Sequence, residues 1–505
     1  MKHTNHHLLC LEKKALNISW GSKWLAGLIP CLALVFLNGC AAVGPDYVPP
    51  EKPLSAQWHT PLEGGLAADP IDQEALSQWW RTLNDPVLSR LMEQAVAGNL
   101  DLKEAQARVR EARAKRGIEE AGLFPYVDAS GKITRSKGSQ ETGAGTQRTL
   151  YAAGFDAGWE VDIFGGIRRS VEAADADLQA SQASLRDVLV TLTAEVGLNY
   201  VEMRAYQTRL RVAEANLKAQ QETLQLTQWR FQAGLSDALS VKQARYNLES
   251  TRSQIPNLRS GLAQAKNRMA VLTGKAPGAI DALLSEARPI PVTPATVAVG
   301  IPADILTRRP DIRQAESELA AQTAQIGVAT ADLYPRFRLS GTIGLESLKL
   351  SDLFKALSRF WNWGPSVSWN VFDAGAIRGN IAVQSALQEQ SLINYEKTVL
   401  SAYEEVENAL TAYAQEQLRR EHLLEAVDAA RQAQELSQDQ YRVGLVDFIT
   451  VLEAQRSLLS LQDQLAVSDG AVTSDLVQLY KSLGGGWESA PPRGSTETKG
   501  KDSES

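Results

Sequence analysis

Four segments of the chain alternate apolar with small or polar residues, which is the two-residue period of a β-strand. In residues 151–163 the odd positions carry apolar side chains such as Trp159, whereas the even positions are mainly Gly, Asp and Glu. Residues 336–345 and 363–371 show the same alternation, and a weaker version follows Pro125. The pattern predicts strands at about residues 126–136, 150–163, 336–345 and 363–372.

Strands of about ten alternating residues with aromatic side chains are typical of outer-membrane β-barrels, although one such strand also fits a soluble, half-buried sheet. Four strands have two open edges, and a bilayer holds no water to satisfy their backbone groups. Several copies must therefore combine to close a barrel in lipid. Two copies give eight strands, which their own side chains fill, whereas three copies give twelve and leave room for water. A conduit thus predicts a homotrimer in contact with outer-membrane lipid.

Two longer stretches, residues 167–231 and 380–443, contain no proline and only one glycine, Gly197. They are rich in Ala, Leu, Gln, Glu and Arg, which favour helix. As a helix, the first stretch is a rod about 97 Å long. Many of its apolar positions are alanine, which lets neighbouring helices approach closely. The pattern predicts a coiled coil or a tubular helical assembly.

The chain repeats itself at a spacing of 210 residues without a gap. Pro125 corresponds to Pro335 and Trp159 to Trp369, and the other matches include glycines that fix backbone geometry. Each half is therefore expected to be one structural unit, built from helix, strand, strand, helix and helix.

The N-terminus carries the features of an export signal. Lys13, Lys14 and Lys23 precede an apolar stretch at 24–37, which has the length of a secretory signal core and is too short to span a bilayer comfortably. The stretch runs into Leu37-Asn38-Gly39-Cys40, which resembles the bacterial lipobox, where the cysteine is acylated. An ordinary signal peptide with an incidental cysteine is the alternative. Because Ala41 rather than Asp follows Cys40, the resemblance implies a lipoprotein of the outer membrane that extends into the periplasm.

The expected organisation follows from these signals. It comprises a signal peptide at 1–39, a lipid-anchored segment at 40–70, repeats at 71–275 and 310–487, a proline-rich equatorial linker at 276–309 and a disordered tail at 488–505.

Composition narrows the possible functions. The 505 residues carry a net charge of -7 and no basic block, which argues against nucleic-acid binding. A mature chain that starts at Cys40 has one cysteine and can form no internal disulfide. Its only histidines are His59 and His422, too few for a Cys/His zinc site. The sequence also lacks the common catalytic and phosphate-binding motifs. We expect no enzyme activity, no cofactor and no metal site.

Four motifs span nearly the whole mature chain and carry a family resemblance. They are Cys40-Ala41-Ala42-Val43-Gly44-Pro45-Asp46-Tyr47, Trp79-Trp80, Arg308-Arg309-Pro310-Asp311 and Leu483-Gly484-Gly485-Gly486-Trp487. They resemble the outer membrane factors of the TolC family, in particular the lipoprotein branch typified by OprM and NodT. The resemblance implies a mostly α fold: a trimeric helical tunnel plus a shared 12-stranded outer-membrane β-barrel, with four strands per chain and two tandem repeats. It also implies a periplasmic adaptor and an inner-membrane RND-type transporter as partners.

The resemblance further implies a gate at the periplasmic mouth. In similar proteins an apolar residue, an acid one turn later and an arginine three residues further narrow the mouth. These positions are Ile449, Glu453 and Arg456 here. A ring of three acids favours cations, and pairing with arginine holds it closed. Similar proteins carry Asp where this chain has Glu453, so this acid reaches further. The alternative is an ordinary helix-surface ion pair, worth about 0.3–0.5 kcal/mol.

Each long helix ends at a matched tip, where a glycine supplies the left-handed residue that stops the helix. An aspartate three residues later, at 237 and at 447, is placed to cap the next helix. By resemblance, Gly234-Leu235 and Gly444-Leu445 contact the adaptor, and exposed leucines at a tip indicate a partner. Local packing of the turn is the alternative.

Together these observations predict the outer-membrane channel of a tripartite efflux pump, a passive conduit that exports small molecules. The same tunnel can serve type I protein secretion or metal efflux, although no Met- or His-lined stripe favours metal ions. A lipid-tethered periplasmic scaffold is a further alternative, but a scaffold needs no lipid-facing strands.

Overall fold

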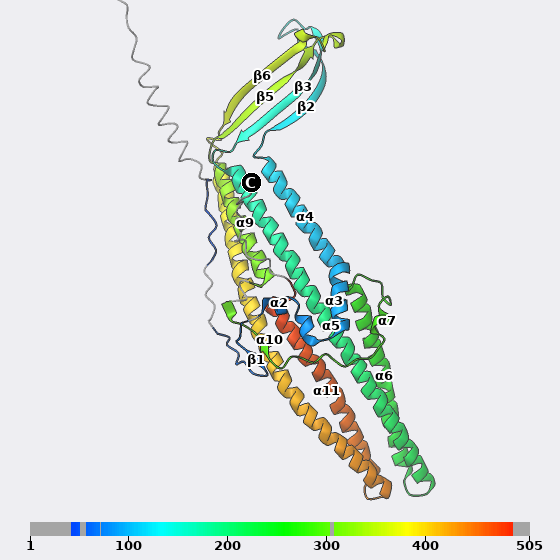
Figure 1. Cartoon of the computed structure of the whole chain (residues 1–505). Coiled ribbons are helices and arrows are strands. Elements are labelled where there is room, and N and C mark those ends of the chain that lie inside the picture. Colours follow the sequence, from blue (N-terminus) through cyan, green and yellow to red (C-terminus); the bar gives the residue numbers. More distant parts are fainter. Residues whose placement is uncertain (1–41, 51–56, 71, 304–307, 488–505) are drawn as a thin grey trace, which may run out of the picture. The chain divides into compact units, whose positions relative to one another are not determined.

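The computed structural model describes residues 42–50, 57–70, 72–303 and 308–487. The predicted signal peptide, Cys40 and the predicted tail lie outside the described residues. The chain divides into two compact units. The first contains Ile118–Glu172 and Ala324–Gln384 together with the described residues up to Asp46, and the second contains the other described residues. Figure 1 colours the chain along its sequence.

The first unit contains a four-stranded antiparallel sheet (Figure 1). Its register places odd-numbered residues beside odd-numbered residues on every neighbouring strand. Phe155 lies opposite Ala129 and Ile343, and Ile343 lies opposite Trp361. All odd-numbered strand positions therefore share one face of the sheet. In order across the sheet, the strands are β2 (Tyr126–Lys137), β3 (Gln147–Val161), β5 (Arg336–Ser347) and β6 (Arg359–Ser368).

The large side chains of the odd-numbered face are mainly apolar and mostly exposed among the described residues, whereas the even-numbered face is mainly polar. Asp156 on the even face accepts hydrogen bonds from Ser130 at 3.0 Å and from Thr342 at 2.7 Å, and so links three strands. An exposed apolar face of this extent requires a partner or an apolar solvent. Its exposed large residues are Val127, Ile133, Phe155, Leu339, Ile343, Trp361, Trp363 and Val367.

Strand β6 differs from its predicted bounds. The alternation predicted residues 363–372, but the strand begins at Arg359 and ends at Ser368. It ends there because Ser368 pairs with Arg336, the first residue of β5, and the chain beyond has no strand beside it. The prediction of strand at Trp369 was therefore wrong: apolar alternation continues past the last ladder pair.

The internal repeat is visible in individual bonds. The indole Nε1 of Trp369 donates to the carbonyl of Leu333 at 3.0 Å, and the indole Nε1 of Trp159 donates to the carbonyl of Leu123 at the same distance. The two bonds are related by the 210-residue spacing of the sequence. The matched tryptophans therefore hold the same kind of helix-to-strand turn in both repeats.

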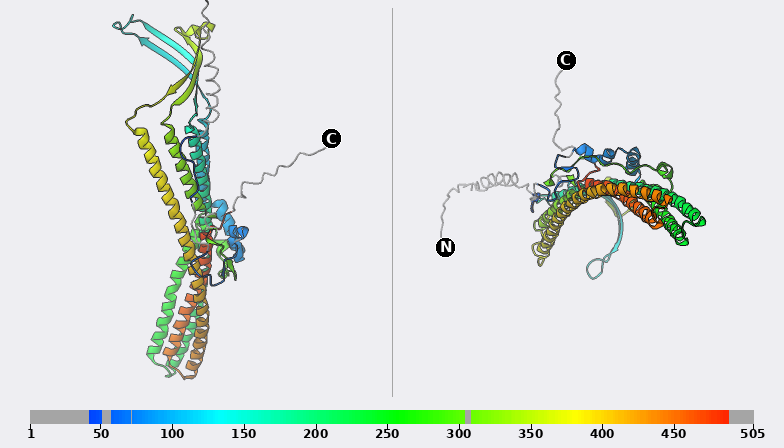
Figure 2. Two further views of the ribbon diagram at one scale, coloured as in Figure 1. Left: turned by 90° about the vertical axis from the view of Figure 1, so that its left-hand side faces the viewer. Right: turned by 90° about the horizontal axis from the view of Figure 1, so that it is seen from below.

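Helices make up most of the second unit, and α5 and α10 also extend into the first. Seen along their length, α5, α6, α10 and α11 form a curved layer (Figure 2). The alanines predicted to allow close packing, such as Ala173 and Ala183, are buried. The helices are α3 (Pro86–Gly98), α4 (Leu100–Ala121), α5 (Gly166–Gln232), α6 (Ala238–Leu272), α9 (Pro310–Ala331), α10 (Ala376–Val443) and α11 (Phe448–Ser482).

Short elements of the second unit pack on the convex side of this layer (Figure 2). Among them are α2 (Gln73–Ser77), η1 (Trp79–Leu83), α7 (Asp281–Leu284) and the parallel strands β1 (Leu66–Ala67) and β4 (Val297–Ala298). Trp79 is 1% exposed and stacks on Tyr480, with ring centroids 5.8 Å apart. Gly197 makes room for it, because a Cβ at this position would lie 2.5 Å from the Trp79 ring. The core of the second unit lies at this junction.

Two of the sequence motifs meet in the same core. The buried Arg309 guanidinium donates to both Asp311 carboxylate oxygens, to Glu405 and, at 3.0 Å, to the carbonyl of Ser482 at the end of α11. Trp487 lies beneath the guanidinium of Arg186, 5.0 Å from the ring centroid. Both motifs thus stabilise the fold.

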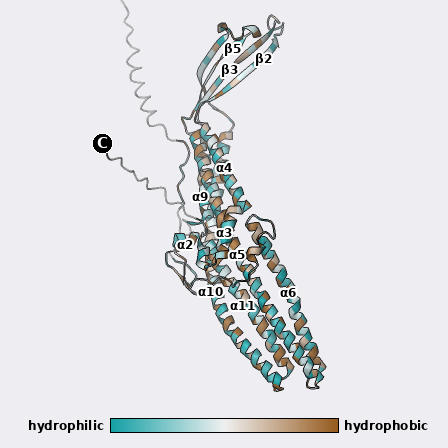
Figure 3. Cartoon of the chain, turned by 45° about the vertical axis from the view of Figure 1, so that its right-hand side comes forward, coloured by the Kyte–Doolittle hydropathy of each residue, from teal (hydrophilic) through white to brown (hydrophobic). Residues whose placement is uncertain are grey.

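Polar residues are spread along the helices (Figure 3). No helix in the described ranges is both long enough and apolar enough to cross a bilayer.

Candidate functional site

The two helical hairpins of the second unit, α5–α6 and α10–α11, end in tips with the same backbone geometry. Gly234 and Gly444 have φ of 73° and 81°. The next amide, that of Leu235, donates to the carbonyl of Arg230 at 2.8 Å, and the amide of Leu445 donates to Gln440 at 2.9 Å. This is the Schellman arrangement, which requires a left-handed residue and therefore favours glycine. The repeat places one such stop at the end of each long helix.

The caps that follow the two tips differ. Asp237 accepts the Ser240 amide at 2.8 Å and caps α6 as predicted, and its bonds with the Ser240 side chain and backbone lower its pKa. Asp447 makes no side-chain cap bond to α11. Its carbonyl accepts the Thr450 amide instead, at 3.1 Å. The predicted side-chain cap at Asp447 was wrong, because its backbone carbonyl and not its carboxylate meets the first turn of α11.

Both tip leucines project into solvent. Leu235 is 67% exposed and Leu445 is 76% exposed. Turn packing, the alternative explanation for these leucines, buries neither side chain within this chain. Trp229 and Leu239 beside the first tip are also exposed. The tips thus present apolar side chains on the described surface.

An arginine near the end of α5 joins the two hairpins. Arg230 Nη1 donates to the carbonyls of Tyr441 at 2.9 Å and Arg442 at 3.3 Å, in the last turn of α10. Its guanidinium also lies over the Tyr441 ring, 4.6 Å from the centroid. A cation is favourable there because the final carbonyls of a helix carry partial negative charge. Arg230 therefore stabilises the end of α10 from the neighbouring hairpin.

A small apolar core lies behind this contact. Tyr441 and Phe448 are buried and meet edge to face at 5.7 Å. Val451 and Leu452 of α11 and Ala244 of α6 complete the buried cluster. The hairpins are therefore packed together up to their tips.

The three predicted gate residues lie together on the first turns of α11. Ile449 is 44% exposed, and Glu453 and Arg456 are also exposed. Arg456 contacts α6: its Nε donates to Asn247 Oδ1 at 3.1 Å, and its guanidinium lies 5.1 Å from the centroid of the Tyr246 ring. Among the described residues Glu453 forms no ion pair, so the helix-surface pair considered as the alternative does not form within this chain.

Further along the helices, polar contacts join α5 to α11. Gln455 donates to Thr223 at 2.8 Å, and Arg209 binds Asp463 through two bonds of 2.7 and 3.0 Å. The bidentate geometry makes the Arg209–Asp463 pair the more specific of these contacts. The two hairpins are thus held together by a series of side-chain bonds.

Sequence reasoning missed Arg230, Asn247 and Tyr246 as parts of this site. The internal repeat could have indicated Tyr246, because this residue corresponds to Arg456 at the 210-residue spacing. Equivalent positions of the two repeats therefore meet. Arg230 corresponds to Gln440, so the only sequence signal at this position is that the two repeats carry different residues.

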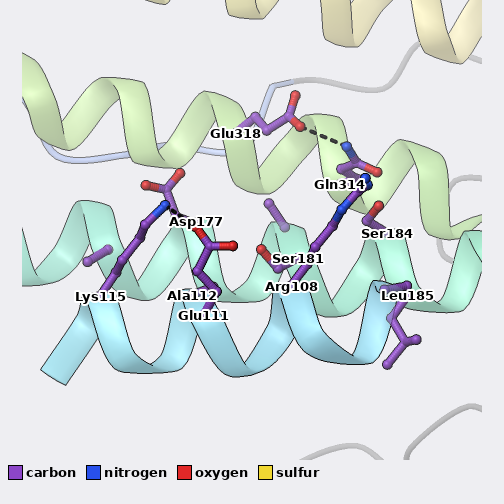
Figure 4. A pocket seen from close by; sticks show the side chains of 13 residues that line it. Arg108, Glu111, Ala112, Lys115, Asp177, Ser181, Ser184, Leu185, Gln314 and Glu318 are labelled. Atoms are coloured by element: carbon purple, nitrogen blue, oxygen red, sulfur yellow. Dashed lines mark hydrogen bonds and ion pairs between the residues drawn. The ribbon is translucent and has the colours of Figure 1, made fainter. Parts of the chain in front are cut away.

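A cavity of about 380 Å³, lined by charged and small apolar side chains, lies between α4, α5 and α9 (Figure 4). Lys115 pairs with Glu111 at 2.8 Å, and Gln314 donates to Glu318 at 2.9 Å. Burial raises the pKa of Asp177, Glu318 adds to the effect and Lys115 opposes it. The charges of the cavity are thus largely balanced by its own side chains. Over the described ranges, no three His, Cys, Asp or Glu side chains gather in a way that could hold a metal ion.

A two-repeat chain with long helical hairpins and an apolar-faced sheet defines a class of membrane channel, and the comparisons agree. The chain belongs to the family of outer membrane efflux proteins, whose model matches residues 91–275 and 301–485. The two matched ranges correspond to the two repeats. Members of this family are outer-membrane channels of efflux pumps and not enzymes.

Individual relatives are similar over almost their whole length. Nodulation protein T of Rhizobium leguminosarum bv. trifolii is 36% identical over 86% of this chain and 91% of its own. The solvent efflux pump outer membrane protein SrpC of Pseudomonas putida is 34% identical over 91% and 98%. The solved outer-membrane channel OprN superposes with a TM-score of 0.84 and 36% identity, covering 89% of this chain and all of that one. The mostly helical fold and the efflux-channel function that we predicted are thereby confirmed.

Proposed function

We propose that three copies of this chain assemble into one conduit through the outer membrane. The observation that carries this proposal is the sheet, whose single apolar face runs across all four strands while β2 and β6 remain open edges. Lipid covers the apolar face, and pairing of β2 with β6 of the next copy satisfies the edges. Three sheets make a twelve-stranded barrel, and the helical hairpins of the three copies enclose the tunnel.

The proposed cargo is small organic molecules, delivered by an inner-membrane RND-type transporter through a periplasmic adaptor. Relatives named for solvent and antibiotic efflux support this cargo class. Protein secretion and metal efflux remain the alternative uses of such a tunnel. The helical hairpins carry no energy-coupling site in our proposal, so the conduit is passive.

The proposed anchor is an acyl group on Cys40, which places the protein at the outer membrane as a lipoprotein. The lipobox-like sequence before Cys40 supports it. Two or more acyl chains hold a protein stably on a membrane, whereas one chain does not.

The proposed gate is formed by Ile449, Glu453 and Arg456 of the three copies. Glu453 is exposed and has no ion-pair partner within the described part of its own chain, so three such acids can form a cation-favouring ring. Arg456 is bound to Asn247 and Tyr246 of α6, so it ties α11 to α6 next to the acids. Opening then separates α11 from α6 and breaks these contacts.

Single-channel conductance in planar bilayers tests the conduit and its gate together. We expect low conductance from the wild type and a severalfold rise in Glu453→Ala with Arg456→Ala. Asp439→Asn with Arg442→Gln is the matched control, because it removes an exposed ion pair of α10 outside the proposed gate. Equal and large conductance in all three proteins overturns the gate, and folded trimers that never conduct overturn the conduit.

The tip leucines are the proposed adaptor contacts, with Gly234 and Gly444 fixing their position. Leu235→Ser with Leu445→Ser removes two exposed apolar groups without disturbing the buried core. We expect weaker cross-linking to the adaptor and unchanged thermal stability. Val48→Ser, at another exposed apolar position, is the control. Unchanged cross-linking in the double variant contradicts the assignment.

A further inference from the structure

The segment Ala42–Asp46 lies along the first unit and is fixed to it by directed bonds. The amide of Val43 donates to the carbonyl of Phe164 at 3.0 Å. Arg169, in the first turn of α5, donates through Nε to the Val43 carbonyl at 3.0 Å and through Nη2 to the Gly44 carbonyl at 3.3 Å. Successive backbone groups of the segment are therefore bound in a defined register.

Arg169 is buried, and most of its side-chain bonds go to the N-terminal segment. It is 3% exposed, and its remaining bonds are two ion pairs of 2.7 Å, with Asp46 and with Glu172. Glu172 belongs to the same helix, whereas Asp46 belongs to the N-terminal segment. A buried guanidinium is costly unless its donors are satisfied. The N-terminal segment supplies three of the four acceptors.

Glycines give the segment room to approach. A Cβ at Gly44, which has φ of 91°, would lie 2.4 Å from the Gly327 Cα of α9. A Cβ at Gly327 would lie 2.7 Å from the Arg169 Cγ, and one at Gly165 would lie 2.5 Å from the Ala42 Cβ. A side chain at any of the three positions displaces the segment or the arginine.

The internal repeat provides a comparison within the same molecule. At the 210-residue spacing, Gly165 corresponds to Gly375 and Arg169 to Gly379. A Cβ at either Gly375 or Gly379 would meet nothing within 4 Å. The second repeat has the same helix start without the arginine, and no described segment covers it. Arg169 thus occurs only in the repeat that contacts the N-terminal segment. The helix start itself does not require an arginine, because the second repeat has glycine at the equivalent position.

We propose that Arg169, Gly165 and Gly327 form a docking site for the chain's own N-terminal segment, which holds the lipid-bearing cysteine beside the sheet. The part that concerns the lipid rests on the proposed acylation of Cys40. Cys40 precedes Ala42 by two residues, a reach of about 7 Å. Ala42 contacts Gly165, which follows the end of β3 at Val161 by four residues. The acyl chains therefore enter the leaflet next to the end of the apolar-faced sheet, and Arg169 is a positioning residue for the anchor.

Hydrogen exchange of the purified full-length protein tests the docking site, read on the peptide that contains residues 42–48. Arg169→Gln is expected to raise the exchange rate of this peptide at least tenfold, with unchanged exchange in the sheet. Glu172→Gln is the matched control, because it removes an Arg169 partner outside the segment, and a change below threefold is expected. Unchanged exchange in folded Arg169→Gln overturns the proposal.

A second variant and a second readout separate the remaining outcomes. If Arg169→Gln does not fold, Asp46→Asn decides, since that carboxylate is largely exposed and its loss leaves the core intact. We expect at least threefold faster exchange, and no change overturns the docking site. The mass of the N-terminal peptide reports acylation separately. A protected segment without acylation supports the docking site and overturns its role as the seat of a lipid anchor.

Discussion

Replacing Arg230 with Gln removes the main polar link between the two hairpin tips. The substitution deletes the charge at the last carbonyls of α10 and the stacking over Tyr441, while keeping an aliphatic stem. A cation at a helix C-terminus contributes about 0.3–1 kcal/mol, and a cation–π contact at a partly exposed site about 0.5–1 kcal/mol. We expect the end of α10 to lose about 1 to 2 kcal/mol of local stability, which is a 5- to 30-fold change in its opening equilibrium.

Amide exchange at Gly444 and Leu445 measures this effect directly, because both amides donate to carbonyls of the last turn of α10. Arg442→Gln is the matched control: Arg442 lies two residues before Gly444, pairs only with the exposed Asp439 in the described contacts and should change exchange less than threefold. A double-variant cycle with Tyr441→Leu isolates the stacking contribution. Equal exchange in Arg230→Gln and Arg442→Gln refutes the reasoning, since it shows that apolar packing alone holds the tips.

Three further outcomes are expected. Burial, with the charge of Glu416 adding to it, raises the pKa of Asp475 to about 6. As the pH rises from the pKa of Asp475 in the unfolded chain to about 6, its ionisation lowers the stability of the folded state. Asp475→Asn should therefore raise the melting temperature at pH 7.5 and not at pH 4. Gly444→Ala at positive φ should cost about 1 kcal/mol, measured by exchange at the tip. Ile343→Arg on the apolar face should cost about 2–4 kcal/mol in lipid and reduce the folded protein in outer membranes, whereas Ser340→Arg on the polar face should be tolerated.

The regular elements were accessible from the sequence because their signal is local. Residue types that favour helix over 60 or more positions, without proline, leave no other structure for α5 and α10. Two-residue alternation marked β2, β3 and β5 within a few residues of their observed bounds. It failed at the end of β6, because a strand ends where its ladder partner ends and not where its apolar pattern ends.

The candidate site was only partly accessible. The glycine stops at the two tips follow from residue type, since positive φ favours glycine. The partner of Arg456 does not follow: helical spacing suggested Glu453 on the same helix, but the arginine bonds to α6. Arg169 and Arg230 each bind backbone carbonyls of distant segments. Every residue has a backbone carbonyl, so residue types do not identify the acceptor.

The sequence by itself therefore determined the elements, their order and the duplication, because periodicity and special backbone residues act over a few neighbouring positions. Its motifs carried the resemblance that indicated the class of channel. Only the tertiary structure decided which buried arginine holds which segment and which strand positions face one another across the sheet. The bonds of Arg169 to Val43 and of Arg230 to Tyr441 join residues more than 100 positions apart, and their geometry depends on the packing of whole helices. At such separations one residue selects its partner only once the fold has brought the two together.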